Sequence, residues 1–210
     1  MEALTIADPA ERENLAAFVG RVLRLDEAAV VRLRRRGDGR LSAWAPTGFD
    51  AVAVRVVDAV MGPSDVTVAA NTLRDGLENG SATVDLGFPM DSAWRGALPP
   101  DTGFVHVDDV PARVLVELAR QGSELAREHT TAPTSLLDQE VLAVEGDGER
   151  VAVPMRVVFA LTAMGFVPYA DTPERIDTAE IVRVRAHKTW LRLDARYGSV
   201  AKRRVTLRVL

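Results

Sequence analysis

The chain has 210 residues and a formal net charge of −4 at pH 7, and 47% of its residues are hydrophobic and 27% charged. This length suits one large domain or two small ones with a hydrophobic core, and the composition excludes a disordered chain, a fibre and a coiled coil. Because cysteine is absent and only three histidines occur, disulfides, thiolate chemistry and sulfur-ligated metals are excluded, and we expect no cofactor.

The N-terminal part alternates between helix and strand signals. An aspartate cap followed by Pro9 predicts a helix that ends near residue 25. Alternating apolar and polar residues then predict a hairpin with strands over 29–36 and 40–45, closed by an Asp-Gly turn. Segment 49–61 is ambiguous, because its β-branched residues favour a strand while its length and alanines permit a helix.

The middle of the chain carries shorter signals and one irregular stretch. We expect a strand over 65–69, a short helix over 72–78 capped by Asn71, and a strand over 81–86. Segment 87–109 is rich in proline and glycine, with Trp94 and Phe104 as aromatic anchors. A long irregular stretch of this kind is usually functional or a linker, so a domain boundary is placed near residue 95.

The C-terminal part repeats the mixture. Asp108, Asp109 and Pro111 predict the start of a helix that runs to residue 127, followed by a loop over 130–137. The remaining signals predict a hairpin over 140–145 and 149–153, an apolar helix over 155–164 stopped by Gly165, and three strands over 181–186, 189–197 and 203–209.

These elements predict an α+β fold in which antiparallel hairpins pack against a few helices. The halves 1–95 and 96–210 have a similar order of elements, and both contain an Arg-Val-Val segment followed by Met-Gly. This match is short, and the sequence leaves open whether the halves are duplicated and whether they form one domain or two.

The charge is distributed unevenly. Residues 181–210 carry nine Lys or Arg and one acid, so they sum to +8, while the first 180 residues sum to −12. Only Lys188 and Lys202 are lysines among 26 basic residues, a bias typical of a high-GC bacterial genome. An arginine here therefore does not by itself indicate phosphate recognition.

The last strands give the candidate binding site. Alternation places basic side chains and a tryptophan on one face of the C-terminal sheet and apolar residues on the other. The candidate binding residues are Arg183, Arg185, Trp190, Arg192, Arg196 and Arg204. Three interpretations stay open: a solvated or internally covered face, a surface for single-stranded nucleic acid, and a surface for an acidic protein partner.

A second, weaker candidate is the acidic cluster of Asp101, Asp108 and Asp109 around His106. Carboxylates and a histidine could hold a hard cation or act as a general acid and base. The alternative is that the aspartates only cap the following helix. Phosphate-binding glycine loops and the nucleophile elbow of hydrolases are both absent from the sequence.

The function that these observations favour is a non-catalytic binding or assembly protein that acts through the exposed sheet face and segment 87–109. We expect a protein partner or self-association, because a terminal strand over 203–210 would need to be paired or covered. The first alternative is a nucleic-acid-associated regulator, and the second is an enzyme with a carboxylate-centred site at 101–109. With no membrane segment and no secretory signal in the sequence, a cytoplasmic location is expected.

Overall fold

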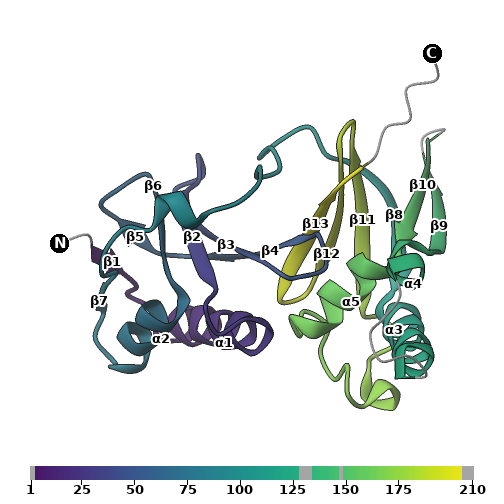
Figure 1. Cartoon of the computed structure of the whole chain (residues 1–210), viewed down its shortest axis with the longest axis horizontal. Helices are drawn as coiled ribbons and strands as arrows, with labels where there is room; N and C mark the ends of the chain where they lie inside the picture. The colour runs from purple at the N-terminus through teal and green to yellow at the C-terminus, as the bar shows by residue number, and fades with distance from the viewer. Residues whose placement is uncertain (1–2, 128–133, 147–148, 205–210) are drawn as a thin grey trace. The chain divides into compact units, whose positions relative to one another are not determined.

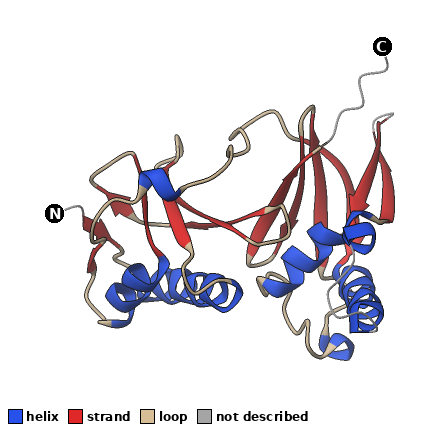
Figure 2. Cartoon of the chain, viewed as in Figure 1, coloured by secondary structure: helices blue, strands red, loops and turns tan. Residues whose placement is uncertain are grey.

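The computed structural model of the chain describes residues 3–127, 134–146 and 149–204. The chain divides into two compact units, one made of Met1–Gly48 and Val52–Leu98, the other of Phe49–Ala51 and Pro99–Leu210. Each unit contains helices and antiparallel strands (Figures 1 and 2), so the α+β fold class is confirmed. That the two halves are separate domains stays a prediction.

The first unit holds two sheets and two helices. Strands β6, β2, β3 and β4 lie side by side in that order, and β5, β1 and β7 form a smaller sheet. The bounds are β1 Ala3–Thr5, α1 Pro9–Leu25, β2 Val30–Arg35, β3 Leu41–Pro46, β4 Val52–Val57, β5 Val60–Met61, β6 Asp65–Ala69, α2 Ala70–Glu78, β7 Thr83–Asp85 and a 3-10 turn Asp91–Ala93.

Local chemistry explains how these elements begin and turn. The Asp8 carboxylate accepts a hydrogen bond from the Ala10 amide at 2.8 Å and caps α1, as the sequence predicts. Gly39 has a φ of +83° in the β2–β3 turn, a conformation that glycine adopts without steric cost. Helix α1 contacts β3 and β4 and buries Leu15 and Val19 completely.

The second unit is built in the same manner. Strands β13, β12, β11 and β8 lie side by side, and β9 and β10 form a hairpin. The bounds are β8 Val105–Pro111, α3 Ala112–Arg127, α4 Thr134–Asp138, β9 Glu140–Gly146, β10 Glu149–Pro154, α5 Met155–Ala163, a 3-10 turn Pro173–Arg175, β11 Ile181–His187, β12 Trp190–Ala195 and β13 Gly198–Arg203.

The helices of the second unit lie on one side of its main sheet (Figure 2), where α5 contacts β12 and β13 and α3 contacts β8. The side chains of Val182, Val184 and Leu193 are fully buried. Because strand side chains alternate between faces, the neighbours of these residues in the sequence point to the opposite, helix-free face. That face carries most of the candidate binding residues.

Most predicted elements are present within a few residues of their expected bounds. Segment 49–61, which the sequence left ambiguous, forms strands β4 and β5 rather than a helix. The β-branched residues dominate there because Val54 and Val57 pack in the core, where a strand buries them on its pleated surface.

Several predicted elements need correction. Asn71 does not cap a helix, because α2 begins at Ala70 and has Ala69 at its N-cap position. Asp108 and Asp109 do not cap a helix, because β8 continues through Pro111 and α3 begins at Ala112. Part of the predicted loop 130–137 is helix α4, and residues 130–133 lie outside the described part. The structure adds a strand that the sequence does not predict, β13 Gly198–Arg203, and the predicted strand 203–209 lies almost entirely outside the described part, since residues 205–210 are not described.

The two halves resemble each other in the order of their elements, but not at the short sequence match. The first Arg-Val-Val segment lies in strand β4, whereas the second, Arg156 to Val158, lies in helix α5. What recurs is the order strand, helix and three strands, once over β1 to β4 with α1 and once over β10 to β13 with α5. Among the described residues, no helix is long and apolar enough to cross a membrane.

Gly146 of β9 tests the packing of the hairpin against β8. A Cβ atom at Gly146 would lie 2.2 Å from the carbonyl oxygen of Val107, a backbone atom that cannot move aside easily. We expect Gly146→Ala to lower the free energy of unfolding by about 1–3 kcal/mol in urea denaturation. In the control Gly20→Ala, the new methyl group has no heavy atom within 4 Å and should stabilise helix α1 by about 0.5–1 kcal/mol. Equal effects of the two substitutions would contradict this packing.

Candidate binding surface

The helix-free face of the second unit's main sheet carries a row of arginines, called here the arginine face. Its members are Arg183 and Arg185 of β11, Arg192 of β12 and Arg203 of β13, which is opposite Trp190 in the strand register. Of the six residues that the sequence singles out, four lie on this face: Arg183, Arg185, Trp190 and Arg192. The other two, Arg196 and Arg204, follow the ends of β12 and β13.

Asp194 connects two of these arginines. Arg185 donates from Nε to Asp194 Oδ2 at 2.8 Å, and Arg192 Nε lies 2.8 Å from Asp194 Oδ1. Arg185 and Arg192 are directly opposite each other in the register, an arrangement that would be repulsive without a counter-charge. The carboxylate between them compensates for this repulsion and leaves one guanidinium charge in excess.

Phe104 covers part of the same cluster. The Arg192 guanidinium carbon lies 4.3 Å from the centre of the Phe104 ring, within the range of a cation–π contact. The Phe104 ring also lies against His187, with 5.6 Å between ring centres. Phe104, expected only as an aromatic anchor, therefore fixes the residues before β8 to the arginine face.

Trp190 does not form an exposed stacking platform. Only 5% of the residue is exposed, and the guanidinium of Arg203 lies 5.8 Å from the ring centre. The alternation places Trp190 on the same face as Arg192, and Arg203 of β13, a strand that the sequence does not predict, lies opposite Trp190 in the register. Trp190 therefore cannot stack on a nucleic-acid base without displacement of neighbouring side chains.

Arg196 and Arg204 serve local contacts. Arg196 donates from Nε to Glu180 at 2.8 Å, and this carboxylate is only 5% exposed. The hydrogen bond and the charge of Glu180 raise the pKa of Arg196 above its ordinary value. Arg204 donates to the carbonyl oxygen of His187 at 3.2 Å. Glu180 is a contributor that sequence reasoning missed, because a single acid before a strand is normally exposed.

The acidic cluster lies at the edge of the arginine face. His106 Nε2 and Asp109 Oδ1 are 3.0 Å apart, and Arg183 Nε lies 3.8 Å from the same carboxylate oxygen. Asp101, His106, Asp108 and Asp109 are all exposed. Within the described ranges, no group of three or more His, Asp or Glu side chains could hold a metal ion. The enzyme alternative stays a prediction.

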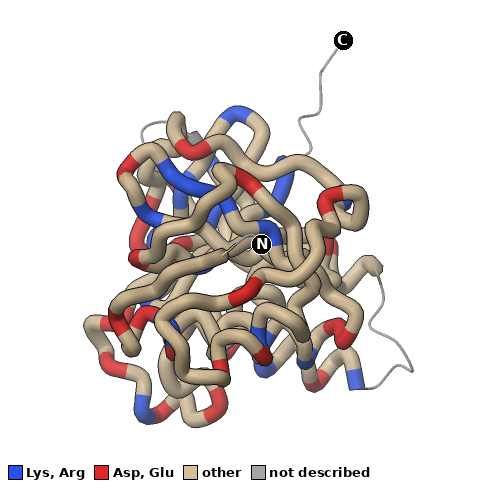
Figure 3. Tube along the Cα trace, turned by 90° about the vertical axis from the view of Figure 1, so that its left-hand side faces the viewer, with Lys and Arg blue, Asp and Glu red and all other residues tan. Residues whose placement is uncertain are grey.

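The arginine face keeps an excess of positive charge. In the ion pairs given by the described residues, two carboxylates, Asp109 and Asp194, serve the four arginines, while basic and acidic residues are interspersed elsewhere along the chain (Figure 3). Arg183 and Arg203 are both exposed, and the side chain of Arg183 is 50% exposed with its Nε 3.8 Å from Asp109 Oδ1. The face can therefore attract an acidic group, to which both side chains are accessible.

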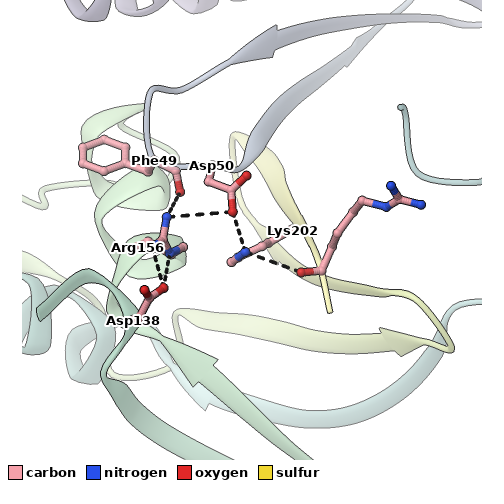
Figure 4. Close-up of polar contacts among 6 residues, drawn as sticks. Phe49, Asp50, Asp138, Arg156 and Lys202 are labelled. Carbon is pink, nitrogen blue, oxygen red and sulfur yellow. Dashed lines mark hydrogen bonds and ion pairs between the residues drawn. The ribbon is translucent and has the colours of Figure 1, made fainter. Parts of the chain in front are cut away.

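A second polar cluster of the same unit surrounds Arg156 of α5 (Figure 4). Arg156 donates to Asp138 at 3.0 Å and to the carbonyl oxygen of Phe49 at 3.3 Å. Lys202 Nζ lies 2.7 Å from Asp50 Oδ2. The two cationic side chains are 11% and 14% exposed, and both carboxylates are mostly exposed. Each buried charge has a partner, so this cluster holds Phe49 and Asp50 in place rather than forming a vacant site.

Comparison with protein families divides the chain close to the boundary between the two compact units, near residue 98. The family model described as Domain of unknown function (DUF8010) matches residues 1–96, and that described as Domain of unknown function (DUF8185) matches residues 99–207. No curated protein sequence matches the chain.

Solved structures with the same fold are bacterial sliding clamps. The DNA polymerase sliding clamp of Bacillus subtilis is 13% identical, with a TM-score of 0.60 over 98% of this chain and 65% of that chain. A putative DNA polymerase III beta subunit from Eubacterium rectale is 10% identical, with a TM-score of 0.62 over 100% of this chain and 66% of that chain. The sliding clamp of Caulobacter crescentus is 15% identical, with a TM-score of 0.57 over 96% and 65%. The chain thus spans slightly less than two thirds of the length of these clamps.

We expect Asp194→Ala to lower the free energy of unfolding by about 1–3 kcal/mol, because two facing arginines lose their shared carboxylate. The free energy of unfolding of Asp194→Asn should lie between those of Asp194→Ala and the wild type, since the amide keeps a hydrogen-bond acceptor but not the charge. Asp38 serves as a control, because it pairs with Arg36 and accepts from the Arg40 amide in an exposed turn, and Asp38→Ala should lower stability less than Asp194→Ala does. Chemical denaturation measures all three, and an Asp194→Ala variant as stable as wild type would contradict the assigned role.

Arg156→Met keeps an unbranched side chain in the core but removes the donors to Asp138 and Phe49. We expect a loss of about 1–2 kcal/mol in the free energy of unfolding, because charged hydrogen bonds at a mostly buried site are removed. Hydrogen exchange should show faster exchange at the amides of residues 49–51 than in wild type. Unchanged exchange there would show that Arg156 does not hold this segment.

Proposed function

Because the chain belongs to the family described as Domain of unknown function (DUF8185), and its fold is that of bacterial sliding clamps, we propose that it is a non-catalytic assembly protein. It associates with further copies of itself or with another protein through surfaces of its sheets and connecting segments. The resemblance to DNA polymerase III beta subunits is the observation that carries this proposal, since it extends over the whole chain.

The arginine face is better suited to a protein partner than to a single-stranded nucleic acid. Arg185 and Arg192 are engaged with Asp194, and Trp190 is buried. A surface that binds single-stranded nucleic acid needs exposed aromatic rings along a basic groove. Trp190 of the arginine face is only 5% exposed and does not meet this need. Protein interfaces instead commonly combine arginines with partly buried aromatic residues.

Association with DNA is the second candidate, because the structural neighbours are named as DNA polymerase sliding clamps and because the arginine face keeps an excess positive charge. Such binding would depend on phosphate contacts and would weaken steeply with salt. Arg183 would contribute most to DNA binding, since its side chain is 50% exposed, more than those of Arg185 and Arg192.

Sedimentation velocity over the micromolar range tests the assembly proposal. We expect a weight-average mass that rises with concentration above the 22.8 kDa of the single chain. A constant mass of 22.8 kDa, together with no change when further purified proteins of the same cell are added one at a time, would overturn the proposal.

Fluorescence anisotropy of labelled single- and double-stranded DNA separates the two candidates. The assembly proposal predicts no binding at moderate salt and the same result for Arg183→Ala. The DNA candidate predicts binding with a log–log salt slope of several charges, which Arg183→Ala reduces by about one. A variant of an exposed arginine on α1, Arg21→Ala, is the matched control for general charge.

A further inference from the structure

The first unit exposes an apolar tip formed by Phe88, Pro89 and Met90, called here the Phe88 tip. Phe88 is 92% exposed, the largest value among the exposed large hydrophobic residues of the described chain, and Met90 is 39% exposed. Single exposed apolar residues are common on protein surfaces. Three adjacent ones on an irregular segment form a small apolar projection that water solvates poorly.

The backbone of the Phe88 tip is held in place on both sides. The amide of Gly87, which has a φ of +68°, donates to Asp85 Oδ1 at 3.0 Å. The amide of Met90 donates to the carbonyl oxygen of Thr67 in β6 at 2.7 Å, and the Thr67 amide donates to Asp91 Oδ1 at 2.7 Å. An exposed phenyl ring on a fixed backbone loses little conformational entropy when it binds.

Two aspartates flank the Phe88 tip in the sequence, while Arg32, which lies 5.8 Å from the ring centre of Trp94, is paired with Asp65 at 2.7 Å. Residues 80–94 contain Asp85 and Asp91 but no lysine or arginine. Both aspartates are exposed, one on each side of Phe88. The tip therefore combines an apolar ring with two negative charges, and it complements a basic surface on which a ring can stack.

The arginine face of the second unit has this complementary character. It holds an excess of positive charge, and Arg192 already stacks on a phenyl ring, that of Phe104. The guanidinium of Arg183 is half exposed, and its Nε lies 3.8 Å from the nearest carboxylate oxygen of Asp109. An additional phenyl ring and carboxylate would find there the same kinds of contact that the face makes within its own chain.

We propose that the Phe88 tip of one copy docks on the arginine face of a second copy. Phe88 stacks on exposed guanidinium groups, and Asp85 and Asp91 lie toward Arg183 and Arg203. This inference rests on the proposed self-assembly and names the surfaces that carry it. Because the two surfaces differ, each bound copy still offers one free tip or one free face, so the contact is heterologous and supports oligomers larger than a dimer.

Two variants separate the two surfaces without affecting the core. Phe88→Ala removes the ring of an almost fully exposed residue, and Arg183→Glu reverses a half-exposed charge. We expect each to raise the dissociation constant for self-association at least about tenfold in sedimentation velocity, as for truncation of an interface anchor. The controls Val60→Ala, at a 69% exposed apolar position, and Arg21→Glu, at an exposed position of α1, should leave the constant within about twofold of wild type.

Mixing the two variants gives the decisive measurement. Phe88→Ala keeps an intact arginine face and Arg183→Glu keeps an intact tip, so an equimolar mixture can form one productive contact. We expect the mixture to form a one-to-one complex of twice the chain mass and nothing larger, while each variant alone remains monomeric at the same concentration.

The other outcomes are distinct. If wild type associates but Phe88→Ala associates equally well, or if the mixture stays monomeric while wild type does not, the docking of the Phe88 tip is wrong and the assembly proposal stands. If wild type itself is monomeric throughout the micromolar range, self-assembly fails and this inference fails with it.

Discussion

The Asp194 carboxylate lies between two arginines that the antiparallel register places directly opposite each other, and the polar face of the second unit depends on it. Arg185 and Arg192 belong to neighbouring strands, and both reach this carboxylate within 2.8 Å. Without it, the sheet would hold two like charges at cross-strand distance, which opposes pairing. With it, Arg192 is fixed so that its guanidinium can hold the ring of Phe104. One acid thus connects β11, β12 and the residues before β8.

This arrangement explains how a sheet can leave one face without a helical cover. The helix-side residues supply the hydrophobic burial, with Val182, Val184 and Leu193 fully enclosed. The opposite face satisfies its charges internally and retains only a modest positive excess. A surface of this kind can stay hydrated in the free chain and still attract an acidic partner, because ion pairs near a surface rearrange at small cost.

The sequence predicts the alternating faces well, because the period of two in β11 and β12 depends only on local pattern. It does not predict the burial of Trp190, nor strand β13, which pairs with β12 and places Arg203 opposite Trp190. Strand β13 begins at Gly198, where a Cβ atom would lie 2.5 Å from Phe166. That glycine is required by a close approach within the fold, and from the sequence alone it indicates only a turn.

The start of α3 is a second feature that the sequence does not predict correctly. Asp108, Asp109 and Pro111 resemble a helix cap, yet Val110 lies opposite Val182 in the sheet and Pro111 ends the strand. Residues before a proline favour an extended backbone, so both structures were compatible with the sequence. Likewise, composition locates the irregular segment before β8 but places its end at residue 109, although β8 begins at Val105. The hydrogen bonds between this segment and Thr67 include one that joins residues 24 positions apart in the chain. Local sequence patterns cannot predict such contacts.

Those hydrogen bonds have a consequence for how the protein behaves when it is concentrated. The amide and carbonyl groups of Thr67 are both occupied, by Asp91 and Met90, at the centre of β6, the outermost strand of its sheet. An intruding strand would have to break both bonds before it could extend the sheet there. Border strands left open are the usual starting points for fibrous aggregates. The same short segment that presents Phe88 therefore protects the chain against uncontrolled stacking, so that any association has to proceed through side chains rather than through this strand.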